Sequence, residues 1–277
     1  MIQVIICDNT FSETLFPPDS LFPIPTSRFL LPPPASRANC VRLRFFGPMS
    51  SIVRVLAIAL LLGTALLGAG AFLHPMLEGD AATQLRVIAA TASWRTVHFA
   101  MLAGSGLVMM GIWVRLVRDS SGSARALAPA LGVITIGLAI SALNISFMAG
   151  SGWRMAQLFQ NGDASMAALF DATHPIGLVA ARLGNFIIAV GAVVLGMIEW
   201  RDRSRPRMLA WLAWLAALAG LVGVAFFDET SRFTLAAAAL LSGWQIVVGV
   251  QSLAAAADAP AGTGNHGGGT TQRELAR

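Results

Sequence analysis

Six apolar segments, each about twenty residues long, dominate this sequence and limit what it can fold into. They cover roughly residues 52–73, 96–117, 127–149, 176–199, 208–227 and 233–253. A helix of about 20 residues spans the hydrocarbon core of a bilayer, which is about 30 Å thick. Only structures that satisfy their own backbone hydrogen bonds are stable there, and a helix does so within one segment. The sequence therefore predicts an all-α integral membrane protein, a bundle of about six transmembrane helices.

Composition supports a lipid-facing surface rather than a water-soluble one. Only 12% of the 277 residues are charged and 56% are hydrophobic, whereas soluble domains are about 25% charged. The net charge of +5 comes from arginine, because the chain has no lysine. The arginines lie in short groups between apolar segments, so we expect no nucleic-acid partner. The absence of lysine and the abundance of Ala, Gly and Arg indicate a GC-rich bacterial source, and hence the cell inner (cytoplasmic) membrane.

Arginine is distributed unevenly among the loops. The arginine-rich parts are the loops after the second and fourth segments and the two flanks of the chain: Arg115, Arg118 and Arg125; Arg201, Arg203, Arg205 and Arg207; Arg54; and Arg273 and Arg277. The other loops hold fewer arginines and more carboxylates. Because arginine-rich loops remain in the cytoplasm, we predict that both termini are cytoplasmic and that the protein is multi-pass.

Residues 1–48 differ from the rest of the chain. They hold eight of the thirteen prolines and both cysteines, Cys7 and Cys40. Proline interrupts helices, so we predict a disordered Pro-rich N-terminal segment. Two interpretations remain open: a cytoplasmic arm that binds a partner, and an upstream extension in front of a true start at Met49.

The first apolar segment also allows two interpretations. Arg54 lies near its start and small residues end it, as in a signal peptide that is cleaved after Ala71. The apolar run continues to Leu73, which is long enough for a transmembrane helix, and we favour that interpretation. The predicted organisation is a six-helix transmembrane domain over residues 49–253 and a flexible cytoplasmic tail over 254–277.

The outer loops are predicted to contain short helices. Asp80 can cap a helix that continues through Leu85 and Ile88 into the second span. Asp163 can cap another helix, with Met166 and Phe170 on one face, which we expect to be a short interfacial outer helix.

Three polar residues lie inside the predicted third and fourth spans: Asn144, Arg182 and Asn185. A membrane-embedded arginine usually faces the bundle interior or a cavity, and residues three apart share a helix face. We therefore predict a polar ligand-binding pocket that opens toward the outer side, lined by the first four spans. Gln245 is the one deep polar candidate in the last two spans, predicted toward the inner side.

Three histidines lie at similar depth near the outer face: His74, His98 and His174. Neutral imidazoles at one level can bind a transition metal or serve as axial ligands of haem. They are our candidate metal ligands, and haem or a transition metal is the candidate cofactor. An interfacial histidine beside a proline can equally mark a helix boundary.

These features favour a non-enzymatic role, because the chain has no Gly-x-Ser-x-Gly motif and no P-loop. The leading hypothesis is a transporter-like protein or an accessory subunit, surrounded by the lipid bilayer and associated with a membrane-protein partner or as a homo-oligomer. The alternative is a haem- or metal-binding membrane redox protein that uses the outer histidines. A third hypothesis is a membrane enzyme in which Arg95 or Arg182 binds an anionic lipid-linked substrate.

Overall fold

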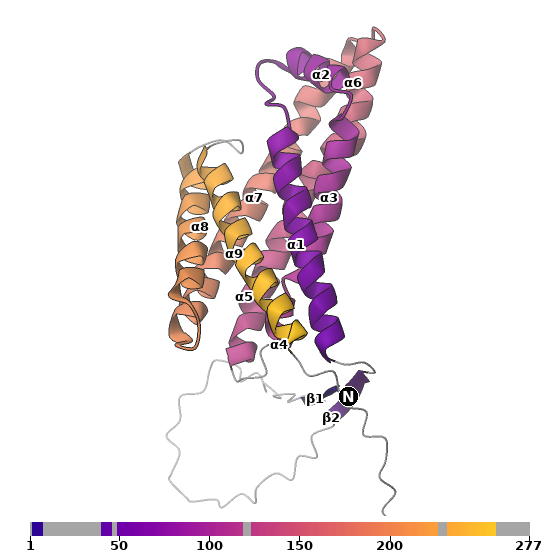
Figure 1. Cartoon of the computed structure of the whole chain (residues 1–277). Helices are drawn as coiled ribbons and strands as arrows, with labels where there is room; N and C mark the ends of the chain where they lie inside the picture. Colours follow the sequence, from indigo (N-terminus) through magenta and orange to yellow (C-terminus); the bar gives the residue numbers. More distant parts are fainter. Residues whose placement is uncertain (1, 8–39, 46–48, 119–122, 227–231, 259–277) are drawn as a thin grey trace, which may run out of the picture. The chain divides into compact units, whose positions relative to one another are not determined.

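The computed structural model describes residues 2–7, 40–45, 49–118, 123–226 and 232–258 (Figure 1). The chain divides into two units, Met1–Met49 and Ser50–Arg277. In the first unit, β1 (Ile2–Cys7) pairs antiparallel with β2 (Cys40–Phe45). Both strands lack proline, and β1 is rich in β-branched residues, which favour strands. The prolines predict a disordered segment over residues 1–48, whereas residues 2–7 and 40–45 of it form β1 and β2. Residues 8–39 of this segment and most of the predicted C-terminal tail lie outside the described residues.

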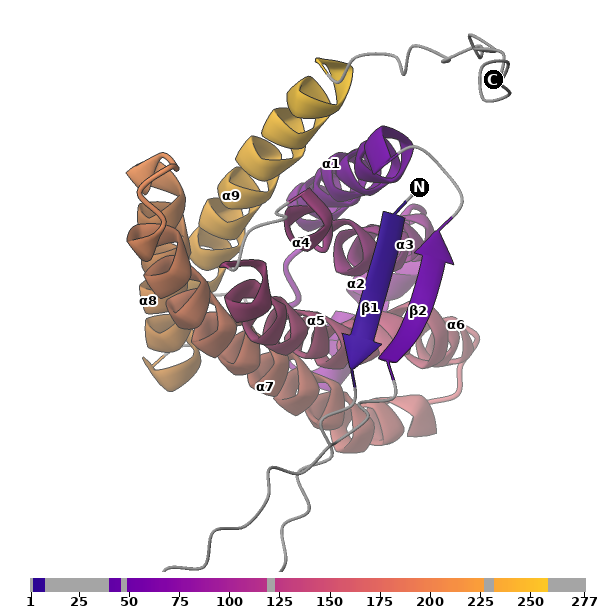
Figure 2. The same ribbon diagram turned by 90° about the horizontal axis from the view of Figure 1, so that it is seen from below.

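The second unit is an all-α bundle, as predicted. Within the described residues, six helical segments are long and apolar enough to cross a membrane. They are formed by α1 (Met49–Leu73), α3 (Trp94–Gly111) with α4 (Val114–Arg118), α5 (Ser123–Phe147), α7 (Ser165–Arg201), α8 (Arg207–Phe226) and α9 (Arg232–Ala257). Each predicted apolar segment corresponds to one of them. Figure 2, turned by 90°, shows α8 and α9 as a pair beside α5 and α7.

Two short helices cover one end of the bundle, α2 (Ala81–Ala90) and α6 (Trp153–Gln160). A π-helical turn, Met148–Gly152, joins α5 to α6. The predicted cap of α2 is confirmed, because the Thr83 N–H donates to Asp80 Oδ1 at 2.8 Å. The helix does not continue into the second span, however. It ends at Ala90, where the Thr91 N–H bonds back to the carbonyls of the last turn.

The helix predicted to begin after Asp163 is not a separate interfacial element. It is the first part of α7, which runs without interruption for 37 residues and passes through Pro175. Transmembrane helices tolerate an internal proline because neighbouring helices and local adjustments satisfy the freed backbone groups. His174-Pro175 is therefore no helix boundary, whereas His74-Pro75 follows the end of α1. The short helices at this end of the bundle are instead α2 and α6.

Glycines allow the closest helix contacts. A Cβ on Gly63 of α1 would lie 2.7 Å from the carbonyl oxygen of Gly104 on α3, and a Cβ on Gly184 of α7 would lie 2.6 Å from the carbonyl oxygen of Gly137 on α5. No side chain fits in these gaps, so backbone packs directly on backbone, the usual way that small residues associate membrane helices.

Two clusters of buried apolar side chains hold the bundle, one toward each end. The cluster nearer α2 and α6 joins α2, α3, α6 and α7 through Leu85, Ile88, Trp94, Met148, Met155, Ala156 and Phe170. The other cluster joins α1, α3, α4, α5, α7, α8 and α9 and includes Leu60, Ile112, Leu131, Leu195 and Trp244. Along α3, α5 and α7, the residues between the two clusters are the ones that surround a cavity.

Candidate functional site

A cavity of about 620 Å³ lies within the bundle. Helices α1, α3, α5, α7, α8 and α9 all contribute to its wall, and most lining side chains are Ala, Gly, Leu or Ile. The described lining residues include no charged side chain. Pockets of 300–1,000 Å³ with apolar walls and a few polar groups are typical of small-molecule sites.

The polar side chains in the wall are amides and hydroxyls. Asn185 of α7 and Ser141 of α5 line the cavity, and neither makes a hydrogen bond to any described residue. Gln245 of α9 lies with its Oε1 2.7 Å from the Thr64 hydroxyl, whose single proton is shared with the Leu60 carbonyl oxygen, also at 2.7 Å, and the Gln245 amide nitrogen donates to no described residue. Because an unsatisfied polar group inside a membrane is costly, these groups point to a hydrogen-bonding occupant.

The structure assembles the predicted ligand residues only in part. Asn185 lines the cavity. Asn144 is not in its lining and packs instead against Gly177 of α7, with its Oδ1 buried. Arg182 has an exposed side chain and is not in the lining either. The sequence predicts a pocket lined by the first four spans. In the structure, α8 and α9 also supply part of the wall, and Gln245 of α9 is one of these residues.

The three candidate histidines fall into two groups. The rings of His74 and His98 have centroids 4.9 Å apart, and Trp94 contacts both, at 5.0 and 4.4 Å. His174 lies in another group, stacked on Phe170 at 4.5 Å. In the part of the chain that the structure describes, no three His, Cys, Asp or Glu side chains form a group able to hold a metal ion.

Backbone groups fix the orientation of the His74–His98 pair. His98 Nδ1 lies 2.8 Å from the Trp94 carbonyl oxygen, and the Trp94 indole N–H donates to the Met148 carbonyl oxygen at 3.0 Å. Because a carbonyl only accepts, His98 Nδ1 carries the proton and Nε2 carries the lone pair. Burial lowers the pKa of His74, against a smaller raising effect from its backbone hydrogen bond with Pro75. Burial thus favours a neutral imidazole at His74, the form that binds metals.

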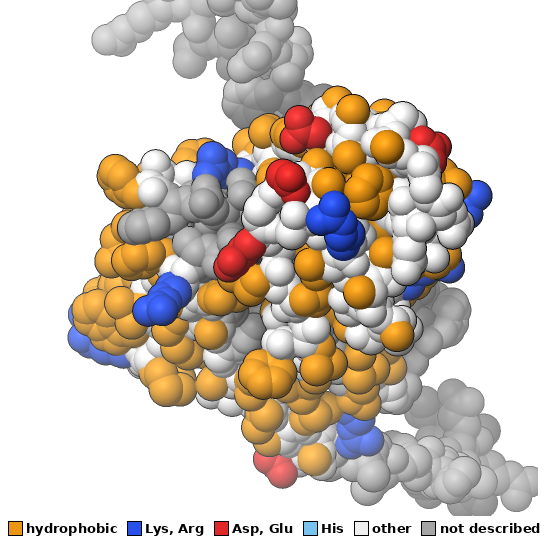
Figure 3. Space-filling model, turned by 90° about the horizontal axis from the view of Figure 1, so that it is seen from above, with side chains coloured by type: hydrophobic (Ala, Val, Ile, Leu, Met, Phe, Trp, Pro, Cys, Tyr) orange, Lys and Arg blue, Asp and Glu red, His pale blue; other side chains and the backbone are white. Residues whose placement is uncertain are grey.

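The acidic side chains at the end of the bundle that carries α2 and α6 are exposed and do not surround the histidines. Glu78, Asp80, Asp163 and Asp171 all lie on the surface. Figure 3, viewed from this end, shows separate acidic and basic side chains scattered among hydrophobic ones. Asp80 caps α2 by accepting from the Thr83 N–H, and its hydrogen bonds from Thr83 lower the pKa of this carboxyl group.

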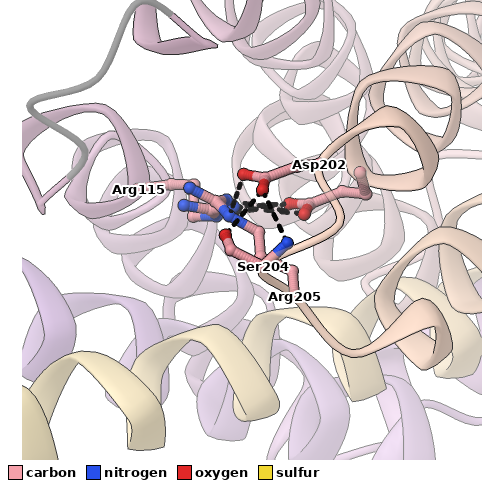
Figure 4. A network of polar contacts seen from close by, with 5 residues as sticks. Arg115, Asp202, Ser204 and Arg205 are labelled. Carbon is pink, nitrogen blue, oxygen red and sulfur yellow. Dashed lines mark hydrogen bonds and ion pairs between the residues drawn. The ribbon is translucent and has the colours of Figure 1, made fainter.

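Sequence reasoning missed a network of charged residues at the opposite end of the bundle (Figure 4). Arg115 of α4 donates to both carboxylate oxygens of Glu199 on α7, at 3.1 and 3.2 Å, and both side chains are almost fully buried. Arg205 reaches Glu199 at 3.5 Å and Asp202 at 2.5 Å. Asp202 Oδ1 also accepts from Ser204. One signal was available: Glu199 is the one carboxylate inside the predicted 176–199 span.

The comparisons with known proteins identify no relative. No family model matches the chain, and no curated protein or solved structure matches it. The cavity, the histidine pair and the charged network are therefore the features from which a function can be inferred. On the fold alone, the chain is a polytopic membrane protein.

Proposed function

We propose that this protein binds a small, uncharged, lipid-soluble molecule in the cavity between its helices, as a non-enzymatic transporter-like protein or accessory subunit. One observation carries the proposal. The cavity of about 620 Å³ has a nearly apolar wall in which the side chains of Ser141, Asn185 and Gln245 keep polar groups without a partner among the described residues.

The wall restricts the chemistry of the ligand. A charged molecule would need a counter-charge in this low-dielectric site, and the described lining has none. The amide N–H groups of Asn185 and Gln245 are donors. They suit a ligand with a carbonyl or hydroxyl group and an apolar chain or ring, such as a quinone, a fatty alcohol or an isoprenoid alcohol.

The cavity would lie toward the outer side of the membrane. Its lining residues in α1, in the second span (Trp94–Arg118) and in α5 belong to the half of each segment nearer α2 and α6. With both termini in the cytoplasm of a bacterial cell, as the arginine distribution predicts, this half is the outer one. A lipid-soluble ligand could then exchange with the outer leaflet of the inner membrane.

Mass spectrometry of lipids that co-purify with the protein tests this function. Asn185→Leu and Gln245→Leu should each lower the amount of bound ligand at least tenfold, because each removes a donor from the cavity. Asn161→Leu and Gln160→Leu are matched controls, since both residues are exposed on the short outer helix region, and they should retain the ligand. If wild-type protein carries no small molecule, or all four variants carry equal amounts, the proposal is wrong.

A metal-binding redox role is the second candidate, favoured by the contact between His74 and His98. With metal–nitrogen bonds of about 2.0–2.1 Å, two imidazoles on one tetrahedral ion have centroids about 5 Å apart. Axial ligands on opposite faces of a haem iron are about 6 Å apart, centroid to centroid. The observed 4.9 Å therefore favours a metal ion over haem.

Elemental analysis of the purified protein for iron, copper, nickel and zinc tests this second role. Near-stoichiometric metal should disappear in His74→Ala and His98→Ala and persist in His174→Ala, because His174 stacks with Phe170 in a different group. A Soret band would instead indicate haem. Wild-type protein that stays metal-free after incubation with each ion and desalting would exclude the metal site.

A further inference from the structure

The turn between α7 and α8 gathers arginine and tryptophan side chains at the end of the bundle opposite α2 and α6. Trp200, Trp211 and Trp214 are in mutual ring contact, with centroids 5.4 to 6.0 Å apart. The Arg207 guanidinium lies over the Trp200 ring, 4.4 Å from its centroid. We call this region the arginine–tryptophan corner; it comprises Trp200, Arg201, Arg203, Arg207, Trp211 and Trp214.

The charged network described above leaves this corner positive. The two carboxylates of that network, Glu199 and Asp202, already form ion pairs with Arg115 and Arg205. Arg201, Arg203 and Arg207 are exposed, and among the described residues none of them has a carboxylate partner. Three cations therefore remain available within seven residues of sequence.

The tryptophans place these cations at the edge of the bilayer. Trp200 is 37% exposed and Trp211 is 52% exposed, and tryptophan is enriched where hydrocarbon meets headgroups. The outward face of α8 continues from Trp211 through Leu215 and Leu218, both exposed and apolar. A lipid could therefore lay its acyl chains along α8 while its headgroup meets the arginines.

We propose that the arginine–tryptophan corner binds a phospholipid with an anionic headgroup, such as phosphatidylglycerol. Guanidinium groups bind phosphate oxygens through paired N–H donors. Arg207 is held by its ring contact with Trp200, so less side-chain freedom is lost when it binds. A zwitterionic lipid adds an ammonium group that the three arginines repel, which gives selectivity for the anionic lipid. This site is separate from the cavity.

Native mass spectrometry of the full chain, released from nanodiscs of mixed phosphatidylcholine and phosphatidylglycerol, tests the proposal. Wild-type protein should retain phosphatidylglycerol in preference to phosphatidylcholine by about tenfold. The triple variant Arg201→Gln, Arg203→Gln, Arg207→Gln should lose this preference. The control Arg86→Gln, Arg95→Gln, Arg154→Gln removes the same charge from exposed residues at the other end and should keep it. Excess inorganic phosphate should not displace the lipid, because it lacks acyl chains.

Several results would overturn the proposal. They are equal retention of the two lipids by wild-type protein, equal loss in both triple variants, and displacement of the lipid by inorganic phosphate. If the first triple variant does not fold, Arg201→Gln and Arg203→Gln provide the test singly, since neither residue makes a ring contact or an ion pair with a described residue. Each should lower the preference about threefold, and unchanged preference in both would also overturn the proposal.

Discussion

Arg115 and Glu199 form a buried ion pair between α4 and α7, although they lie 84 residues apart in the sequence. Both the Nε and Nη2 atoms of Arg115 donate to the carboxylate, at 3.1 to 3.2 Å. Only 6% of the Arg115 side chain and 1% of the Glu199 side chain are exposed. The ion pair therefore links the end of the second span to the end of the fourth span, at the end of the bundle opposite α2 and α6.

Removal of one member of this pair should destabilise the protein strongly. In Glu199→Ala, Arg115 loses its buried counter-charge, and breaking a buried pair typically costs about 3–5 kcal/mol. The double variant Arg115→Met, Glu199→Met should be less destabilised, because it buries no unpaired charge. Unfolding in detergent by denaturant titration measures both. A single variant as stable as the double variant would contradict this account.

The contact between α1 and α3 should be sensitive to one methyl group. A Cβ at Gly104 would lie 2.9 Å from the Gly63 carbonyl oxygen, so Gly104→Ala forces the two backbones apart at a cost of about 1–3 kcal/mol. Gly106→Ala is the matched control on the same helix, since nothing lies within 4 Å of its added Cβ. Thermal unfolding of the purified variants should show a lower midpoint for Gly104→Ala alone.

The end of the bundle that carries α2 and α6 should be destabilised by acid through His74. Burial lowers its pKa in the folded protein below the usual value of about 6.5. The unfolded chain then binds more protons, so stability is complete above about pH 6.5 and falls as the pH drops below it. A protonated His74 would also face His98 across 4.9 Å. Thermal unfolding between pH 7.5 and 5 should show this loss, and it should be smaller in His74→Phe.

The cap of α2 should control the local stability of that helix. Asp80→Ala removes the acceptor of the Thr83 N–H bond, and loss of an N-cap frays the first helical turn. Because hydrogen bonds lower the pKa of Asp80, the cap is intact above its unfolded-state pKa and is lost only as the pH falls through the lower folded value. Hydrogen exchange of α2 amides should rise severalfold in Asp80→Ala and stay unchanged in Asp171→Ala, an exposed carboxylate on α7.

The candidate site was only partly accessible from the sequence. Asn185 stood out because an amide in an apolar segment is costly wherever it faces. For the same reason the sequence predicts Arg182 and Asn144 as pocket residues. In the structure, however, the rotation of the helices leaves Arg182 exposed and packs Asn144 against Gly177. Ser141 gave no signal, because serine is tolerated on any face of a membrane helix. Its role in the wall follows only from the way α5 packs on α7.

The sequence by itself determined the six spans and the Asp80 cap, because each depends on residues within one or two helical turns or on the length of one apolar run. The tertiary structure decided the rest. It joined α7 into one helix through Pro175, brought His74 to His98 but not to His174, paired Arg115 with Glu199 and left a cavity between two packed clusters. These features depend on the rotation and tilt of helices distant in sequence, which many small contacts fix together and no single segment encodes.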